Sequence, residues 1–214
     1  TRMVKNNMKY AFLIPSGQQM VPNILFQQWV PFQEWLAKNE DGKIISMVAS
    51  NQVEGRNKLL TQGNQSNPYE FAKTVEWFIF IDADIKFSLQ QMQELMYSDE
   101  MFVSGWYIFN PNNQTSLVGY WKDEPTVLSP KEVLSHKEIF EVDHVAGGFM
   151  KIHSSLIQQL EFPFYYVPKI ERPSGETTWV TEDLVFARNV YEKTGVKPKV
   201  IPTLKVGHVK WVTI

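Results

Sequence analysis

The chain has 214 residues, a formal net charge of −2, 43% hydrophobic residues and no cysteine. This charge balance gives no broad basic surface for nucleic acid or an anionic membrane, and the lack of thiols excludes disulfides, zinc–thiolate sites and cysteine nucleophiles. No low-complexity linker divides the chain and no stretch is apolar enough to span a bilayer, so we expect one globular domain without a membrane span. The absence of cysteine fits a reducing compartment, and we expect a cytoplasmic protein.

Apolar runs of strand length alternate with helical patterns through the first half of the sequence. Strands are predicted over residues 10–14, 44–49, 77–81 and 102–107. Helices are predicted between them, over residues 24–37, 57–62 and 89–96. Strands that alternate with helices are typical of a largely parallel sheet with helices on both faces.

The second half of the sequence has a looser pattern. Turn formers over residues 110–130 predict an insertion at one end of the sheet, with one arm of a hairpin at residues 117–121. Residues 162–178 are predicted to be a long loop. Further strands are predicted over residues 140–145, 200–201 and 204–206, and further helices over residues 156–160, capped by Ser154 or Ser155, and 182–193, capped by Thr181 and closed by Gly195. The whole is predicted to be a single α/β/α sandwich with a mostly parallel central sheet.

Two aspartates, Asp82 and Asp84, directly follow the strongly apolar strand at residues 77–81. That strand is apolar on both faces, which indicates a position in the middle of the sheet. Residues two apart in an extended chain point to the same side, so we expect both carboxylates at the edge where open α/β sheets bind ligands. Two carboxylates so close favour a divalent cation that also binds phosphate. Aspartates after a strand also form turns and cap helices, and the motif alone leaves both interpretations open.

Three further segments carry candidate functional residues near the ends of predicted elements. Gly147 and Gly148 follow a predicted strand, Glu182 and Asp183 open a predicted helix, and His208 follows a short strand near the carboxyl end. Each segment also has a plain structural interpretation. A glycine pair makes a tight turn, acids in a first turn stabilise the helix through its dipole, and a single histidine is usually structural.

The order and spacing of these motifs resemble those of a GT-A fold glycosyltransferase, a class of enzymes with a nucleotide-sugar donor. The resemblance covers most of the chain and rests on residues 78–84, 145–152, 181–186 and 206–208. It implies a GT-A-like fold, with a donor-binding half at about residues 8–108 and an acceptor-side half at about residues 109–214. It also implies a site for a metal ion, Mn²⁺ or Mg²⁺, at Asp82, Asp84 and His208. Asp84 would bind the ion directly, His208 would complete the site, and Asp82 would contact the ion through water or contact the donor ribose.

The same resemblance implies roles for the other candidate residues. Asp183 would be the general base that deprotonates the acceptor, and Glu182 would support the acceptor or the start of the helix. Donor-binding contacts would come from Asp82, Ala83, Pro15, Ser16, Arg56 and Asn57. Contacts with the sugar or acceptor would come from the backbone of Gly147 and Gly148 and from the rings of Trp106 and Trp179.

We therefore expect a metal-dependent glycosyltransferase that moves a sugar from a nucleoside diphosphate sugar, with a UDP-sugar favoured, to an acceptor hydroxyl with inversion. A retaining enzyme of the same fold is an alternative, because the motifs specify donor binding better than stereochemistry. A nucleotidyltransferase is a second alternative, although the segment after the first strand, which begins Pro15-Ser16-Gly17, lacks the basic loop usual in that class. The third alternative is a sugar-binding domain without turnover.

Overall fold

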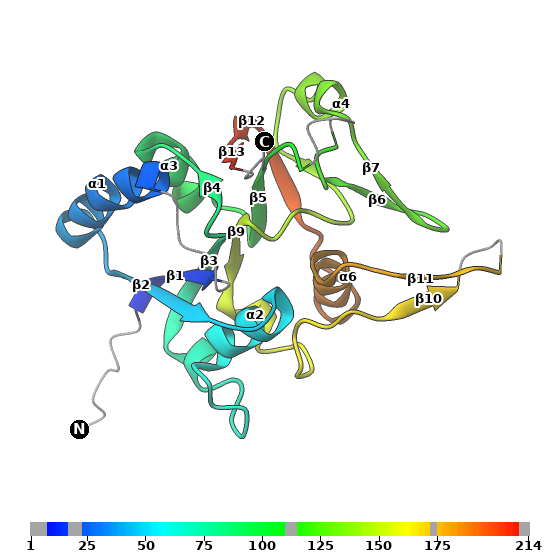
Figure 1. Cartoon of the computed structure of the whole chain (residues 1–214), viewed down its shortest axis with the longest axis horizontal. Helices are drawn as coiled ribbons and strands as arrows, with labels where there is room; N and C mark the ends of the chain where they lie inside the picture. Colours follow the sequence, from blue (N-terminus) through cyan, green and yellow to red (C-terminus); the bar gives the residue numbers. More distant parts are fainter. Residues whose placement is uncertain (1–7, 17–22, 110–114, 172–174, 210–214) are drawn as a thin grey trace.

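A computed structural model describes residues 8–16, 23–109, 115–171 and 175–209 (Figure 1). Its centre is a seven-stranded sheet in the order β2-β1-β3-β9-β5-β12-β8. The strands are β1 (Met8–Ser16), β2 (Gly42–Val48), β3 (Val75–Ile81), β5 (Phe102–Trp106), β8 (Phe140–Glu141), β9 (Phe149–His153) and β12 (Lys199–Lys205). Both β2 and β3 pair in parallel with β1, and β12 pairs in parallel with β5. Only β9, between β3 and β5, and the edge strand β8 run the other way, which confirms a mixed α/β protein with a mostly parallel sheet.

The central position of β3 follows from its sequence. Phe78, Ile79, Phe80 and Ile81 are each fully buried, because β3 pairs on both sides and is covered on both faces. Successive side chains alternate between the faces of a strand, so a strand that is covered on both faces contributes to two cores. Phe78 and Phe80 belong to one hydrophobic cluster, whereas Ile79 and Ile81 belong to the other.

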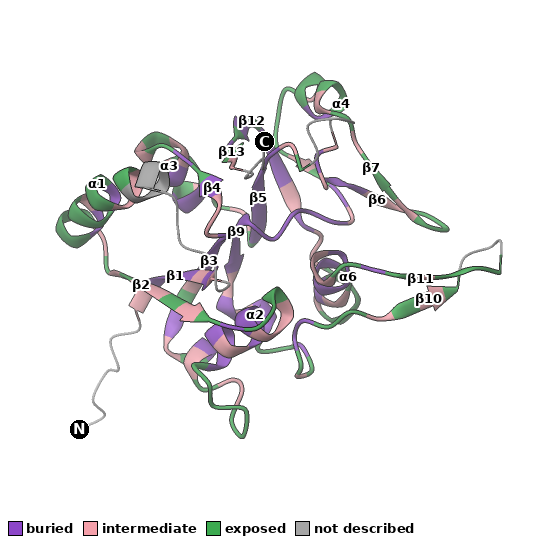
Figure 2. Cartoon of the chain, viewed as in Figure 1, coloured by how far each residue is buried: buried purple, intermediate pink, exposed green. Residues whose placement is uncertain are grey.

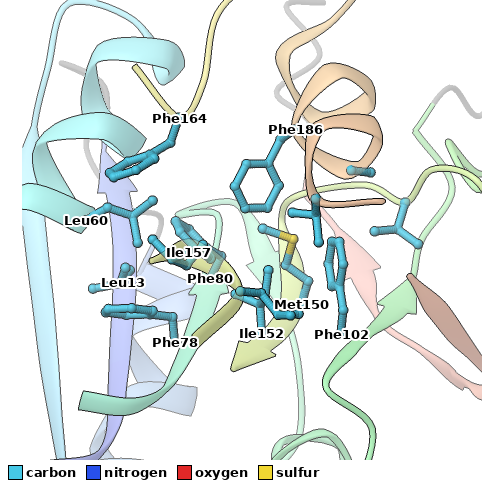
Figure 3. Packing of buried hydrophobic residues seen from close by; sticks show 14 of the residues in the cluster. Leu13, Leu60, Phe78, Phe80, Phe102, Met150, Ile152, Ile157, Phe164 and Phe186 are labelled. Atoms are coloured by element: carbon cyan, nitrogen blue, oxygen red, sulfur yellow. The ribbon is translucent and has the colours of Figure 1, made fainter. Parts of the chain in front are cut away.

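Helices cover each of these two cores. The first core includes Leu59 and Leu60 of α2 (Gln52–Thr61), Ile157 of α5 (Ser154–Ile157) and Phe186 of α6 (Glu182–Thr194), and Figure 3 shows several of these side chains packed over the sheet. The second core includes residues from α1 (Asn23–Asn39) and α3 (Leu89–Tyr97) on the opposite face. In Figure 2 the middle strands of the sheet, β3, β9 and β5, are coloured largely as buried. No helix in the described ranges is long and apolar enough to cross a membrane.

Two β-hairpins project from the sheet on the side of α6 (Figure 1). One joins β6 (Gly119–Trp121) to β7 (Pro125–Val127), and the other joins β10 (Lys169–Glu171) to β11 (Thr177–Trp179). The remaining elements are the short helices η1 (Phe71–Lys73) and α4 (Pro130–Ser135) and the strands β4 (Ile85–Lys86) and β13 (Gly207–His208). All of the second hairpin except its last residue, Trp179, lies in the segment of residues 162–178 that the sequence predicted to be a long loop.

Several element boundaries differ from the sequence-based predictions. Helix α2 begins at Gln52 rather than at residue 57, because Asn51 caps it by accepting a hydrogen bond from the Glu54 amide at 2.9 Å. Strand β9 was not predicted, and the last long strand, β12, is continuous rather than split. His153, not a serine, caps α5, and Thr181 occupies the N-cap position of α6 without a side-chain hydrogen bond to the helix. Gly195 closes α6 in the left-handed conformation, as predicted.

Candidate functional site

A tight turn directly after β3 separates Asp82 from Asp84. The Ile85 amide donates to the Asp82 carbonyl at 3.0 Å, which closes the turn before β4 begins. The rule that residues two apart share a side holds only in extended chain, and in this turn the two carboxylates have different hydrogen-bond partners. Asp82 turns to Arg56 and is buried, whereas the side chain of Asp84 is 48% exposed and turns to His208. Ala83, between them, is partly buried and stays only a predicted donor contact.

Asp84 and His208 meet although they lie 124 residues apart in the sequence. The two-stranded pairing of β4 with β13 brings them together, with His208 opposite Ile85. The His208 Nε2 and Asp84 Oδ2 atoms are 3.0 Å apart, and the Val209 amide donates to the Asp84 carbonyl at 2.9 Å. The imidazole is largely buried beside the ring of Tyr107, whose centroid is 5.0 Å away. The structure thus joins two of the three predicted metal ligands.

This pair fits part of a metal site. Carboxylate oxygen and imidazole nitrogen are both suitable ligands for Mn²⁺, and such a site keeps open positions for phosphate oxygens and water. Asp82, the third residue predicted for the metal site, accepts hydrogen bonds from Arg56 on both oxygens, and its contact with a metal through water or with a donor ribose stays a prediction. Within the described parts of the chain, no group of three or more His, Asp or Glu side chains is placed to hold a metal ion. Of the three predicted residues, the structure therefore brings together Asp84 and His208 as a pair of candidate ligands.

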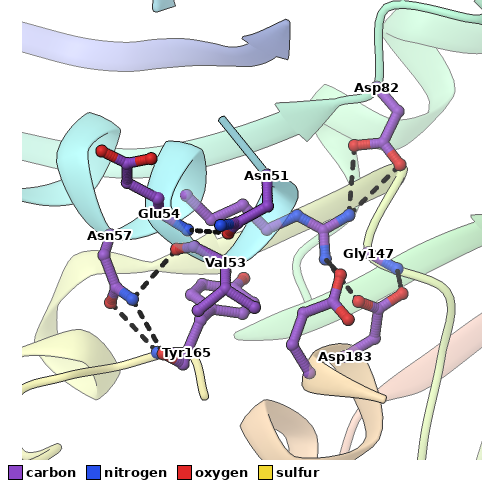
Figure 4. Close-up of polar contacts among 10 residues, drawn as sticks. Asn51, Val53, Glu54, Asn57, Asp82, Gly147, Tyr165 and Asp183 are labelled. Carbon is purple, nitrogen blue, oxygen red and sulfur yellow. Dashed lines mark hydrogen bonds and ion pairs between the residues drawn. The ribbon is translucent and has the colours of Figure 1, made fainter. Parts of the chain in front are cut away.

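A buried guanidinium, that of Arg56, forms ion pairs with three acids in the second part of the site. Two of these acids, Asp82 and Asp183, are labelled in Figure 4. The Nη2 of Arg56 donates to both oxygens of Asp82, at 3.1 and 3.2 Å. Its Nη1 bonds Asp183 Oδ1 and lies 3.3 Å from Glu182 Oε1. Helix α2 therefore ties the turn after β3 to the start of α6. The side chain of Arg56 is only 1% exposed, so the structure contradicts its prediction as an accessible ligand for the donor phosphates.

The Gly147-Gly148 segment supports this network from the other side. The Gly147 amide donates to Asp183 Oδ2 at 2.9 Å, and the Gly148 carbonyl accepts from the Asp82 amide at 2.9 Å. A Cβ at position 147 would lie 2.6 Å from Arg56 Nη1, and one at position 148 would lie 2.7 Å from Asp82 Oδ2. The two glycines therefore make room for the protein's own side chains. The expectation that both amides are free to donate to a ligand is wrong for Gly147.

Burial and charge shift the pKa values of these acids in opposite directions. Burial raises the pKa of Glu182, and the charge of Asp183 raises it further, to about 7. Burial would also raise the pKa of Asp183, but the charge of Arg56 and the Gly147 amide outweigh burial and lower it. Burial keeps the pKa of Asp82 above its ordinary range in spite of Arg56. The pKa of Arg56 stays well above its ordinary value, because the carboxylates of Asp183 and Asp82 outweigh the effect of burial.

Two of the predicted ligand contacts are structural. Trp106 is fully buried and its indole donates to the Pro202 carbonyl at 2.8 Å, so its predicted stacking on a sugar is wrong. Asn57 is also buried, and its side chain bonds both the amide and the carbonyl of Tyr165, at 3.1 and 2.8 Å. This contradicts its prediction as a donor ligand. Asn57 instead fixes the backbone of the segment that carries Tyr165.

The other predicted contacts remain open to a ligand to different degrees. Trp179 is 63% exposed on β11, and lines a groove between the two projecting hairpins with Pro125 and Val127 of β7. Pro15 and Ser16 end β1, where the Ser16 hydroxyl donates to the Met47 carbonyl at 3.3 Å. Their proposed contacts with a donor stay predictions.

Tyr165 is a site residue that the sequence analysis missed. It is fully buried, its ring lies 5.4 Å from the Arg56 guanidinium carbon, and its hydroxyl has no hydrogen-bond partner among the described residues. No local pattern marks this tyrosine, because its neighbourhood comes from α2 and α6, which are distant in sequence.

The fold and the site define an α/β protein with a polar site at the carboxyl ends of its parallel strands, built from an Asp–His pair and a buried Arg–carboxylate network. No family model and no curated protein matches the chain. Among solved structures, the chain is similar to the crystal structure of A197 from STIV, with 20% sequence identity and a TM-score of 0.55. That match covers 95% of this chain and 87% of A197. At this identity the likeness shows the fold alone.

Proposed function

We propose that this protein is a metal-dependent glycosyltransferase that moves a sugar from a nucleoside diphosphate sugar, with a UDP-sugar favoured, to an acceptor hydroxyl. The observation that carries the proposal is the meeting of Asp84 and His208 at the end of β3, 3.0 Å apart. A carboxylate and an imidazole at this edge of a parallel sheet suit a site for a divalent ion and a diphosphate.

The proposed reaction is an in-line displacement with inversion. Asp84 and His208 would hold Mn²⁺ or Mg²⁺, which would neutralise the charge that develops on the departing diphosphate. The acceptor oxygen forms its bond to the anomeric carbon while the bond from that carbon to the diphosphate oxygen breaks. The proton of the acceptor passes to a carboxylate of the Glu182–Asp183 pair, whose position at the start of α6 is fixed by Arg56.

A thermal-shift screen of nucleotide sugars, with and without Mn²⁺, tests the proposal, together with an assay for released nucleoside diphosphate. We expect stabilisation by one nucleotide sugar that depends on Mn²⁺ and disappears in Asp84→Asn and in His208→Asn. Asp123→Asn is a matched control, because Asp123 is an exposed acid in the β6–β7 hairpin. The proposal fails if no donor binds, or if the Mn²⁺-dependent shift survives both site variants.

A second candidate function is the binding of a nucleotide sugar or carbohydrate without turnover. The observation that favours it is the contact of Asp82 with Arg56, which donates to both oxygens of this aspartate. Asp84 and His208 are then the two side chains left to bind the metal directly. Donor binding without any released nucleoside diphosphate, at any acceptor concentration, would support this binding function over transfer.

A further inference from the structure

The two acids at the start of α6 differ in how their carboxylates are held. Asp183 accepts from Arg56 on one oxygen and from the Gly147 amide, at 2.9 Å, on the other. Glu182 lies farther from Arg56, at 3.3 Å, and its carboxyl also interacts with its own backbone amide and with the carboxyl of Asp183. The two side chains are 13% and 12% exposed, so burial does not distinguish them. The difference lies in their hydrogen-bond donors, which favour the ionised form of Asp183 far more than that of Glu182.

The charge balance of the network also favours a protonated Glu182. One guanidinium faces three carboxylates, those of Asp82, Asp183 and Glu182, within a largely buried cluster. Full ionisation would leave an excess of negative charge out of water, which favours the retention of a proton. The proton is held most easily by the carboxylate with the weakest contacts to its ionised form, which is Glu182. The pKa of about 7 for Glu182, raised by burial and by Asp183, agrees with this placement.

Glu182 also faces a place where a substrate could bind. It lines a surface pocket together with Asn51, Gln52 and Val53, at the start of α2, and with Tyr166 and Val167. The buried Tyr165 precedes this pair, and its hydroxyl has no partner among the described residues. An acid at the wall of a pocket, with a pKa near neutral pH, is suited to accept a proton from a bound hydroxyl.

We infer that Glu182, and not Asp183, accepts the proton of the acceptor hydroxyl, while Asp183 and Arg56 position it. This inference rests on the proposed glycosyl transfer. In that step the acceptor oxygen bonds to the anomeric carbon, and its proton moves to a carboxylate oxygen of Glu182. The electron pair of the broken carbon–oxygen bond leaves with the nucleoside diphosphate.

The pH dependence of this step depends on the groups around Glu182. Asp183 is its neighbour on α6, Arg56 faces it from α2, and Tyr165 and Tyr166 lie in the segment that leads to β10. Asp82 acts on it through Arg56. Because the negative charge of Asp183 raises the pKa of Glu182, removal of that charge should lower it. The apparent values from a rate profile belong to the coupled pair of acids.

Steady-state kinetics of the intact protein, with the donor identified by the screen, distinguish the two acids. We expect kcat/KM of the wild type to rise about tenfold per pH unit up to about pH 7. Glu182→Gln should lose about 100-fold or more of kcat and this pH limb. Asp183→Asn should keep a limb that moves to lower pH, and Glu192→Gln, an exposed acid on the same helix, should behave as the wild type. A limb that survives in Glu182→Gln and vanishes in Asp183→Asn overturns the inference.

A measurement that needs no turnover separates this inference from the proposed function. Carbon-13 NMR of protein labelled at the glutamate carboxyl groups, assigned by comparison with Glu182→Gln, reports the titration of Glu182 directly. Titration near pH 7, together with the kinetic pattern above, supports the inference. Titration below pH 5 overturns it even if the protein transfers sugar. Absence of turnover with every donor refutes the proposed function, and with it the catalytic role of Glu182, whatever the NMR titration shows.

Discussion

Replacement of Glu182 by glutamine should change the way in which stability depends on pH. A carboxyl whose pKa is raised on folding contributes stability at low pH, and this contribution is lost as pH rises through the folded value. For Glu182 the relevant window runs from its ordinary 4.5 to about 7. At about 1.36 kcal/mol per pKa unit, this difference sets an upper limit of ~3 kcal/mol. Access of water through the pocket reduces it, so we expect Glu182→Gln to gain about 1–3 kcal/mol relative to wild type between pH 4.5 and 8.

Urea unfolding, followed by tryptophan fluorescence at a series of pH values, measures this gain. The comparison across pH cancels any constant cost of the substitution, such as the lost contact with Arg56. Glu138→Gln, at an exposed position in a loop, is the control and should differ from wild type by the same amount at every pH. A flat difference for Glu182→Gln would mean that the glutamate ionises as it does in water. A gain that falls as pH rises would mean that Arg56 holds Glu182 ionised, and either result refutes the reasoning.

Three further substitutions, two in the site and one in the core beside the end of α3, are tested by denaturant unfolding. Arg56→Met removes the only cation of the described carboxylate network and should cost about 3–5 kcal/mol near pH 7.5, and less at pH 5, where the carboxylates can take up protons. An equal cost at both pH values would contradict this. Gly148→Ala should cost about 1–3 kcal/mol of stability, because its Cβ would lie 2.5 Å from the Tyr107 hydroxyl oxygen and 2.7 Å from Asp82 Oδ2. A neutral effect would show that these side chains have room to move aside. Lys151→Met should cost about 1–3 kcal/mol of stability, because the buried ammonium donates to the Met96 carbonyl at 3.1 Å and to the Ser98 carbonyl. An unchanged midpoint of urea unfolding would refute this.

Patterns within single segments predicted the framework of the fold. The apolar run at 77–81 identified the buried central strand, because no surface position tolerates so many large apolar side chains in succession. The alternation of strands and helices gave the mostly parallel sheet. The antiparallel strand β9 could not be recognised in this way, since its direction depends on pairing with β3 and β5, which are far away in the chain.

The candidate site was predictable only in part. The meeting of Asp84 with His208 was implied by the resemblance to GT-A fold glycosyltransferases, and the structure contains it. The burial of Arg56 could not be predicted from the sequence. Its charge suggests a surface position, and its three carboxylate partners lie 26 to 127 residues away. Trp106 and Trp179 also show that residue type does not determine burial. Trp106 lies in the core, whereas Trp179 is 63% exposed. Only the tertiary neighbours decide such cases.

The split of the Asp-x-Asp motif assigns different tasks to its two acids. Asp82 is buried and shares the Arg56 guanidinium with Asp183, so it couples the turn after β3 to the start of α6. Asp84 is half exposed and holds His208, so it can meet a ligand without disturbing that coupling. A change at Asp84 should therefore affect ligand binding with little loss of stability. A change at Asp82 should cost stability as well, because it leaves part of the buried guanidinium without its counter-charge.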